Sequence, residues 1–302
     1  MRVSTNMIYD QGVSAMQRQT AGLLHTGQQL ATGRKILTPA DDPVASARAL
    51  DVTQSRSVNA QFITNQGYAE DALRLVEGQL TGAGEIIQYA RERVLAAGNP
   101  ALSDSDRRSI AADLGAQFDA MLAISNTRDA NGDYLFAGYQ SNTPPFAAAT
   151  NGSVRGADYE GDQGTRTMQV SSSRFMPVSF AGEDAFGGGD GSVFKVLGEF
   201  ISALESGASV SGAVSGALEG LDQSLDTVLT VRAQIGSQLV EVEQLGFIGS
   251  DLDLQYATTL SGLQDLDFNE AISRLKQQET YLQAAQQSFL KITGLSLFNY
   301  LS

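Results

Sequence analysis

Apolar residues recur every seven positions near both ends of this chain, and this spacing restricts the folds open to it. The first repeat consists of Met16, Leu23, Leu30 and Leu37, and the last consists of Phe268, Leu275, Leu282 and Phe289. A seven-residue apolar repeat marks one face of a helix that packs along another helix. Both ends of the chain are therefore expected to be helices that pack on each other or on copies of themselves.

Each stripe taken alone fits the buried face of an ordinary helical domain equally well. Glu279 and Gln286 occupy the other core position of the last stripe, so an isolated two-stranded coil built on it would be weak. A helix shared among several neighbours in a tubular array tolerates polar residues at such positions better. The terminal location of both stripes favours this second interpretation.

The charge is divided unevenly along the chain. The 302 residues carry a net charge of -14. Residues 1–60 and 251–302 together hold nine Lys or Arg and ten Asp or Glu, which leaves -13 for the middle. The nearly neutral ends can pack closely without strong repulsion, whereas the acidic middle argues against binding to nucleic acid. Solubility alone would also explain an acidic middle.

Helix signals dominate the chain. We expect a helix over residues 1–37, weakened by Gly22, Gly27 and Gly33, and a long helix from Pro43 to about residue 97. Ser103 and Asp106 form a capping-box pattern that starts a helix ending near residue 128. Helical patterns return at 194–204 and from about 217 through the 250s, and a second capping pattern starts the last helix at Asp267.

Residues 129–191 differ from the rest, because Gly, Ser, Thr, Asn and Pro become frequent there. Short alternating runs at 166–170 and 176–180 predict β-hairpins. The predicted fold is mainly α with a small β insertion: a long antiparallel helical bundle formed by both chain ends, in nested layers, with a tip domain rich in β-hairpins. The predicted domains are 1–42 with 262–302, 43–142 with 192–261, and 143–191.

No catalytic, cofactor or metal site is predicted. The chain has no Cys and one His, His25, which lacks a second His or Cys to act with. Asp41 and Asp42 are better explained as helix caps beside Pro39 and Pro43 than as cation ligands. The acidic residues Asp251, Asp253, Asp265 and Asp267 lack the spacing of a calcium loop. Residues 187–191 (GGGDG) lack the features of a phosphate loop.

The opening segment MRVSTNMIYDQG has no apolar core of a secretory signal, and no apolar run is long enough to cross a membrane. We therefore expect no membrane insertion. Any passage out of the cell is expected to use a route without a cleaved signal peptide.

Two terminal segments resemble the bacterial flagellin superfamily. Residues 30–50, LATGRKILTPADDPVASARAL, are similar to its N-terminal signature, and residues 291–302, KITGLSLFNYLS, to its C-terminal helix. Residues 132–146, GDYLFAGYQSNTPPF, resemble the branch of hook-associated junction proteins. So do residues 159–166, YEGDQGTR, residues 176–186, MPVSFAGEDAF, and the opening MRVSTNMIYDQ.

This resemblance implies a structural junction protein of the bacterial flagellum that is not an enzyme. The implied partners are the first hook-associated protein, flagellin, other copies of the chain in a ring, and a cytoplasmic export chaperone at the C-terminal region. It further implies type III export and an extracellular position between hook and filament. The terminal helices would form an inner tube, the central helices a surrounding layer, and the β insertion the outer surface.

The predicted functional residues therefore form contact surfaces for other protein chains. The two stripes, together with Ile292, are expected to form an assembly seam. Pro39, Asp41, Asp42 and Pro43 are expected to set the turn between inner and middle layers. Two alternatives remain open: flagellin itself, and a secreted enzyme with a metal site in the acidic β insertion. An assembly protein is the interpretation that the residues favour.

Overall fold

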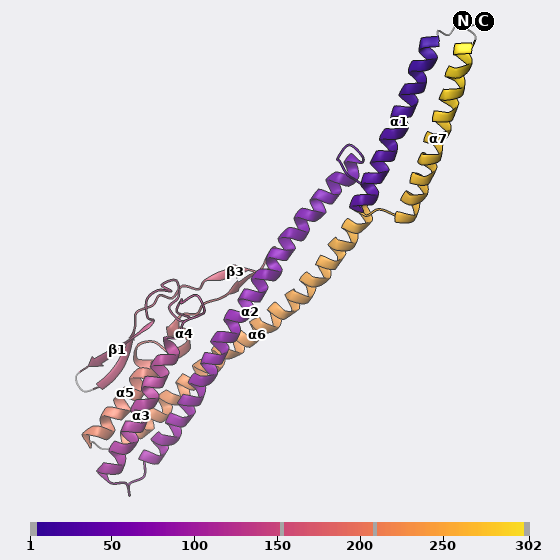
Figure 1. Cartoon of the computed structure of the whole chain (residues 1–302). Coiled ribbons are helices and arrows are strands. Elements are labelled where there is room, and N and C mark those ends of the chain that lie inside the picture. Colours follow the sequence, from indigo (N-terminus) through magenta and orange to yellow (C-terminus); the bar gives the residue numbers. More distant parts are fainter. Residues whose placement is uncertain (1–4, 152–153, 208–209, 299–302) are drawn as a thin grey trace. The chain divides into compact units, whose positions relative to one another are not determined.

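A computed structural model describes the backbone of residues 5–151, 154–207 and 210–298. Only the backbone is described for residues 5, 6, 8, 151, 190, 210 and 292–298. The helices are α1 (Thr5–Thr32), α2 (Pro43–Ala97), α3 (Asp104–Ser125), α4 (Gly182–Phe186), α5 (Val193–Ser206), α6 (Val210–Gln264) and α7 (Phe268–Phe298). The strands are β1 (Phe146–Asn151), β2 (Val154–Tyr159), β3 (Thr167–Gln169) and β4 (Phe175–Pro177), and a short 3-10 helix covers Gly189–Gly191. The predicted fold class, mainly α with a small β insertion, is confirmed (Figure 1).

The chain divides into two compact units. The first unit runs up to Val58 and resumes at Asp251, and the second is Asn59–Ser250. The long helices α2 and α6 each contribute residues to both units. The three-domain division expected from the sequence stays a prediction.

In the first unit, α1 and α7 lie side by side and run in opposite directions (Figure 1). The space beside Gly12 is filled by the ring of Phe289, that beside Gly22 by Gln278, and that beside Gly33 by Phe268. The three contacts are spaced 10 and 11 residues apart from Gly12 to Gly33, and 11 and 10 residues apart from Phe289 back to Phe268. The two terminal helices therefore keep one antiparallel register.

The second unit holds one continuous hydrophobic core. Leu73, Leu80 and Ile87 of α2 are fully buried in it, as are Leu221 and Ile235 of α6. Apolar residues recur at intervals of three, four and seven in both helices, and burying such a stripe stabilises the pair by the hydrophobic effect. Core positions in α3 and α5, which pack on each other, complete the cluster.

Two antiparallel hairpins complete the second unit. Strand β1 pairs with β2, with Phe146 opposite Tyr159 and Thr150 opposite Arg155. Strand β3 pairs with β4, with Met168 opposite Met176. The alternating runs of the sequence correctly indicated β3 and β4. They did not indicate β1, whose FAAATN sequence has three consecutive alanines between its one aromatic and its one β-branched residue.

Three helix ends expected from the sequence are wrong. Helix α6 begins at Val210, inside the Ser- and Gly-rich stretch, and not near residue 217. The first helix ends at Thr32, because Gly33 adopts a left-handed φ of 68° that L side chains rarely adopt. Leu37, the last member of the first stripe, therefore lies in the turn after the helix. Helix α3 ends at Ser125, and the side chain of the next residue, Asn126, bonds to Phe146. The capping box of Ser103 and Asp106 is confirmed.

Candidate assembly surfaces

The α1–α7 seam contains more polar and small residues than an ordinary helix interface. Thr26, Gln29 and Ala271 are its buried residues, while Leu23 and Leu275 are half-buried. The side-chain nitrogen of Gln29 donates to the carbonyl of Lys35 at 2.6 Å, but the Gln29 oxygen has no hydrogen-bond partner within the described chain. Buried polar atoms without partners cost free energy, so this seam is weaker than its length suggests.

The stripe residues lie at different depths. Met16, Leu30, Leu282 and Phe289 are half-buried, whereas Phe268 is 52% exposed at the start of α7. Leu37 is half-buried in the turn, and the side chain of Ile292 lies outside the described residues. The structure therefore places the described stripe residues of α1 and α7 on facing helices, and their role in assembly stays a prediction.

Sequence reasoning missed the second set of seam residues. Gly12, Thr26 and Ala271 lie three or four residues from members of the stripes, the spacing typical of packed helices, and Gln29 lies three residues after Thr26. Because their side chains are small or polar, a search for large apolar repeats did not select these residues. Tyr9 was also missed, although its ring lies 5.2 Å from that of Phe289.

The α1–α7 pair carries large apolar side chains on its outside. Leu24 is 60% exposed, and about half of the surface of Met7, Tyr9, Ile272 and Tyr281 is exposed as well. A shallow groove of about 420 Å³ on α1 is lined by Val13, Met16, Gln17, Thr20, Ala21 and Leu24. The apolar residues of this groove are a candidate contact surface for another protein.

The turn between α1 and α2 is organised by the two predicted aspartates. One oxygen of Asp41 accepts the backbone N–H groups of Leu37 and Thr38, at 2.9 and 2.8 Å. These bonds, first the one from Thr38, lower the pKa of Asp41, and His25 at 3.7 Å lowers it further. Asp42 accepts the N–H groups of the first turn of α2, which begins at Pro43. Asp42 therefore caps α2 as expected, whereas the expectation of a helix cap is wrong for Asp41, whose carboxylate bonds within the turn.

A cavity of about 220 Å³ opens beside this turn. Leu37, Pro39, Ala49 and Leu50 give it apolar walls, and Leu50 is 71% exposed. The Ser46 hydroxyl is buried there without a hydrogen-bond partner among the described residues. The turn thus combines one capped helix start with exposed apolar side chains, as expected of a docking surface.

In the second unit, one tyrosine hydroxyl connects three backbone segments. The single O–H of Tyr159 lies within donor distance of the carbonyls of Asp162, at 2.7 Å, and Phe136, at 3.1 Å, and its oxygen accepts the N–H group of Gly182. Burial raises the pKa of Tyr159. The segments joined in this way are those of the YLFAG, YEGDQG and AGEDAF motifs. The motifs therefore form one structural cluster that shapes the β region.

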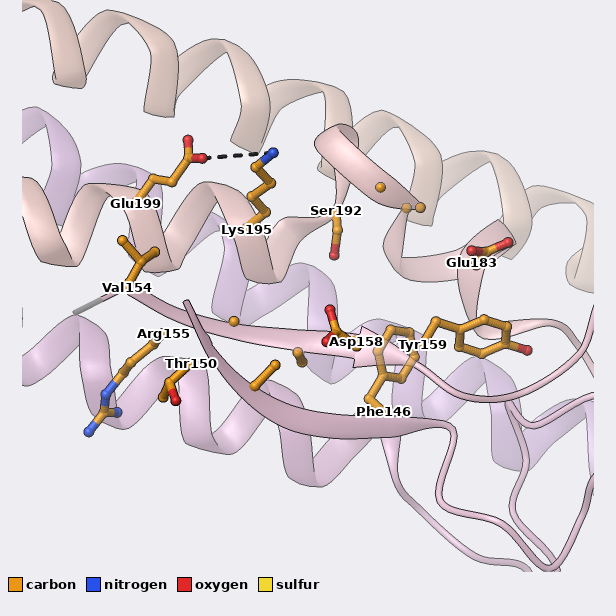
Figure 2. A pocket seen from close by; sticks show the side chains of 16 residues that line it. Phe146, Thr150, Val154, Arg155, Asp158, Tyr159, Glu183, Ser192, Lys195 and Glu199 are labelled. Atoms are coloured by element: carbon orange, nitrogen blue, oxygen red, sulfur yellow. Dashed lines mark ion pairs between the residues drawn. The ribbon is translucent and has the colours of Figure 1, made fainter. Parts of the chain in front are cut away.

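A polar cavity of about 640 Å³ lies between α5 and the β1–β2 hairpin (Figure 2). Its cations are paired within the chain, Lys195 with Glu199 and Arg155 with Asp119. Among the described side chains, no group of three or more His, Asp or Glu residues could hold a metal ion. Asp253 of α6 is likewise engaged, because it pairs with Arg56 at 2.8 Å.

None of the described helices is both long and apolar enough to cross a lipid bilayer. The features gathered on the described surface are thus a helical seam with exposed apolar residues, a capped turn and a hairpin region. They favour protein–protein contact over chemistry on a small molecule.

Comparison with known proteins agrees with these features. Residues 3–141 match the bacterial flagellin N-terminal helical region. A helix pair made from both chain ends, joined to two long helices and a β region, defines a protein of the flagellin superfamily.

Two relatives that match almost the whole chain identify one family within this superfamily. The chain is 35% identical to flagellar hook-associated protein 3 of Salmonella typhimurium and 36% identical to that of Escherichia coli, over 99% of each chain. The chain belongs to the flagellar hook-associated protein 3 family, whose members are structural proteins of the hook–filament junction. The resemblance to the junction branch is confirmed. Flagellin of Listeria innocua is a distant relative, 23% identical over 54% of the chain.

Solved structures show the same fold. FlgL of Xanthomonas campestris has a TM-score of 0.62 at 19% identity, covering 70% of this chain and 99% of the other. The flagellar junction protein FlgL of Legionella pneumophila has a TM-score of 0.59 at 20% identity, covering 72% of this chain and 100% of the other.

Proposed function

We propose that this chain forms a ring that joins the hook to the flagellin filament outside the cell. Its partners in this role are the first hook-associated protein on one side, flagellin on the other, and neighbouring copies within the ring. The observation that carries the proposal is the 35% identity to flagellar hook-associated protein 3, which extends over 99% of both chains.

The contacts of the ring are proposed to run through the terminal helices. Leu24, Ile272 and Tyr281 are exposed on the outside of the α1–α7 pair, where burial against a neighbour would stabilise the assembly. The two stripes with Ile292 form the predicted seam, and Pro39, Asp41, Asp42 and Pro43 set the predicted turn. The terminal helices would lie in the inner tube, the central helices around it and the β region outside.

Export is proposed to use the flagellar type III route without a cleaved signal peptide, with a cytoplasmic chaperone bound to the C-terminal region. Unpaired polar atoms of the seam, such as the Gln29 oxygen, would ease the unfolding that threading requires. The absence of Cys also leaves no disulfide to hinder passage.

Swimming motility tests the assembly surface. Leu24→Glu places a charge in the exposed groove, and should abolish filament growth when the variant replaces the native chain in the bacterium that encodes it. Gln28→Glu is the matched control, because Gln28 is exposed on the same helix and its side chain has no hydrogen bond within the described chain. Both purified variants should unfold at the temperature of the parent. Normal filaments with Leu24→Glu would exclude this surface.

Removal of residues 1–37 provides a second test. The remaining chain should stay folded, because the core of the second unit lies within Asn59–Ser250. It should fail to support filament growth. Copy number separates the junction role from the flagellin alternative, since a junction ring needs few copies for each filament and a bulk subunit needs very many.

A further inference from the structure

Helices α2 and α6 contain three glycines that the packing of the second unit does not require. Nothing in the described chain lies within 4 Å of a Cβ atom added at Gly67 or Gly78 of α2, or at Gly236 of α6. These three open glycines lie far from the ends of their helices, and none of them has a positive φ. They lower helix propensity without serving a turn or a close contact within the described chain.

Other glycines of α6 do have a packing role. A Cβ atom on Gly220 would lie 2.6 Å from the side chain of Val196, and one on Gly249 would lie 2.9 Å from that of Ile63. An alanine at an open glycine would meet no such obstacle. The open glycines are therefore places where these helices are weaker than their packing demands.

One open glycine of each helix lies beside the same ion pair. The guanidinium of Arg232 in α6 donates to the carboxylate of Glu77 in α2 at 2.8 Å. Gly78 is the next residue of α2, and Gly236 lies one helical turn after the arginine in α6. The Nε atom of Arg232 is buried there and has no hydrogen-bond partner among the described residues. Both helices are thus weakened at one level of the pair.

A second weak level surrounds Gln66, which precedes Gly67 in α2. Its side-chain nitrogen donates to the carbonyl of Val170 at 2.7 Å, but its oxygen is buried without a hydrogen-bond partner in the described chain. Cβ atoms added at Gly246 and Gly249 of α6 would lie 4.0 and 3.6 Å from that oxygen. Buried polar atoms without partners cost free energy, so both levels combine low helix propensity with missing hydrogen bonds.

The open glycines have a sizeable effect on stability. Each lowers the ratio of folded to unfolded chain about fivefold relative to alanine, and the three together lower it about 100-fold. The stretch of α2 between Gly67 and Gly78 is shorter than about 12 residues, the length below which an isolated helix is marginal in water. Regions with weak helix propensity and missing hydrogen bonds are those that open first.

We propose that the two weak levels are break points, at which the α2–α6 pair opens first when the chain is unfolded for export. This inference rests on the proposed export route. Passage through an export channel requires two helices of 55 residues each to separate and unwind. Break points at matching levels divide that task into shorter steps, because an opening in one helix meets a weak segment of the other.

The full chain carrying Gly67→Ala, Gly78→Ala and Gly236→Ala tests the proposal in solution. Its melting temperature should rise by about 5–10 °C. Hydrogen exchange should slow most in the peptides that cover these three positions. The matched control replaces three exposed glutamines of the same helices that have no hydrogen bond within the described chain, and it should melt close to the parent. The control substitutions are Gln61→Ala, Gln88→Ala and Gln244→Ala.

Export is measured in the bacterium that encodes the chain, by immunoblots of the cells and of the medium with detached flagella. The triple glycine variant should reach the outside at a severalfold lower level than the parent, whereas the glutamine control should match the parent. Adding Leu80→Ala to the glycine variant removes a fully buried side chain, so it should lower the melting temperature again and restore export.

The proposal is overturned if the more stable glycine variant is exported as well as the parent, or if Leu80→Ala does not restore its export. Normal export without filament growth would also overturn it, and would indicate that another chain approaches closely at the open glycines. A parent chain that stays inside the cell would instead contradict the proposed export route itself, so the two failures are distinguishable.

Discussion

Gly12 of α1 and Phe289 of α7 fit together so closely that a Cβ atom on Gly12 would lie 2.6 Å from the ring of Phe289. Real Cβ atoms do not approach carbon this closely. The glycine therefore has a packing role, in addition to the loss of helix propensity that it brings.

We predict that Gly12→Val destabilises the α1–α7 pair by about 1–3 kcal/mol, because the new side chain would force the ring of Phe289 out of place. Gly27→Ala is the matched control on the same helix, since nothing lies within 4 Å of its added Cβ. That control should stabilise α1 by about 1 kcal/mol. Hydrogen exchange of α1 amides measures both effects, and protection that rises in Gly12→Val would contradict the packing role.

Asp42 should contribute measurably to the stability of α2. Asp42→Ala leaves the N–H groups of Val44 and Ala45 without their acceptor, and should cost about 1 kcal/mol. Asp51→Ala, at an exposed position inside the same helix, removes a similar charge without removing a cap. Thermal unfolding monitored by circular dichroism compares the two. Equal melting temperatures for both variants would argue against the cap.

Tyr159→Phe should destabilise the second unit by about 1–3 kcal/mol, because it removes the hydrogen bond to the carbonyl of Asp162. Tyr139→Phe is the control, since Tyr139 is 66% exposed. Chemical denaturation followed by far-UV circular dichroism gives the free energy difference.

The raised pKa of Tyr159 gives a second readout with a definite sign. The folded state favours the neutral hydroxyl, so the stabilisation is complete below the unfolded pKa of about 10 and declines as the pH rises above it. Unfolding measured between pH 9 and about 11 should therefore show a steeper loss of stability in the parent than in Tyr159→Phe. If stability falls with pH equally in the parent and in Tyr159→Phe, ionisation of Tyr159 does not cause the loss.

Acid should weaken the second unit through Glu77. The hydrogen bond from Arg232, at 2.8 Å, lowers the pKa of Glu77 below its ordinary value of 4.5. Stability from this pair is therefore complete above that value and is lost as the pH falls through the lower folded pKa. Glu77→Gln should be less stable near neutral pH and depend less on pH below about 4.5. A parent and variant with equal acid dependence would contradict this assignment.

The sequence predicted most of the fold, because helix periodicity and capping are local signals. Ser103 with Asp106 marked the start of α3, and Pro43 marked the start of α2. Two features of the structure were not predicted, because they depend on contacts that form only in the folded chain. Strand β1 is held by Asn126 and by pairing with β2, so its alanine-rich sequence gave no sign of it. Gln29 was missed because its burial depends on the folded environment at the end of α1, where its amide donates to the carbonyl of Lys35.

The antiparallel pairing of α1 and α7 also has a cost in chain entropy. Gly12 and Phe289 are separated by almost the whole sequence, and closing so long a loop costs about 5 kcal/mol. The ion pair of Arg56 with Asp253 encloses most of that loop, and forming it first would lower the remaining cost by about 1 kcal/mol. We therefore expect α1 and α7 to pair last during folding. Substitutions that destabilise α2 or α6 would then weaken the α1–α7 pair, although they lie in neither of these two helices.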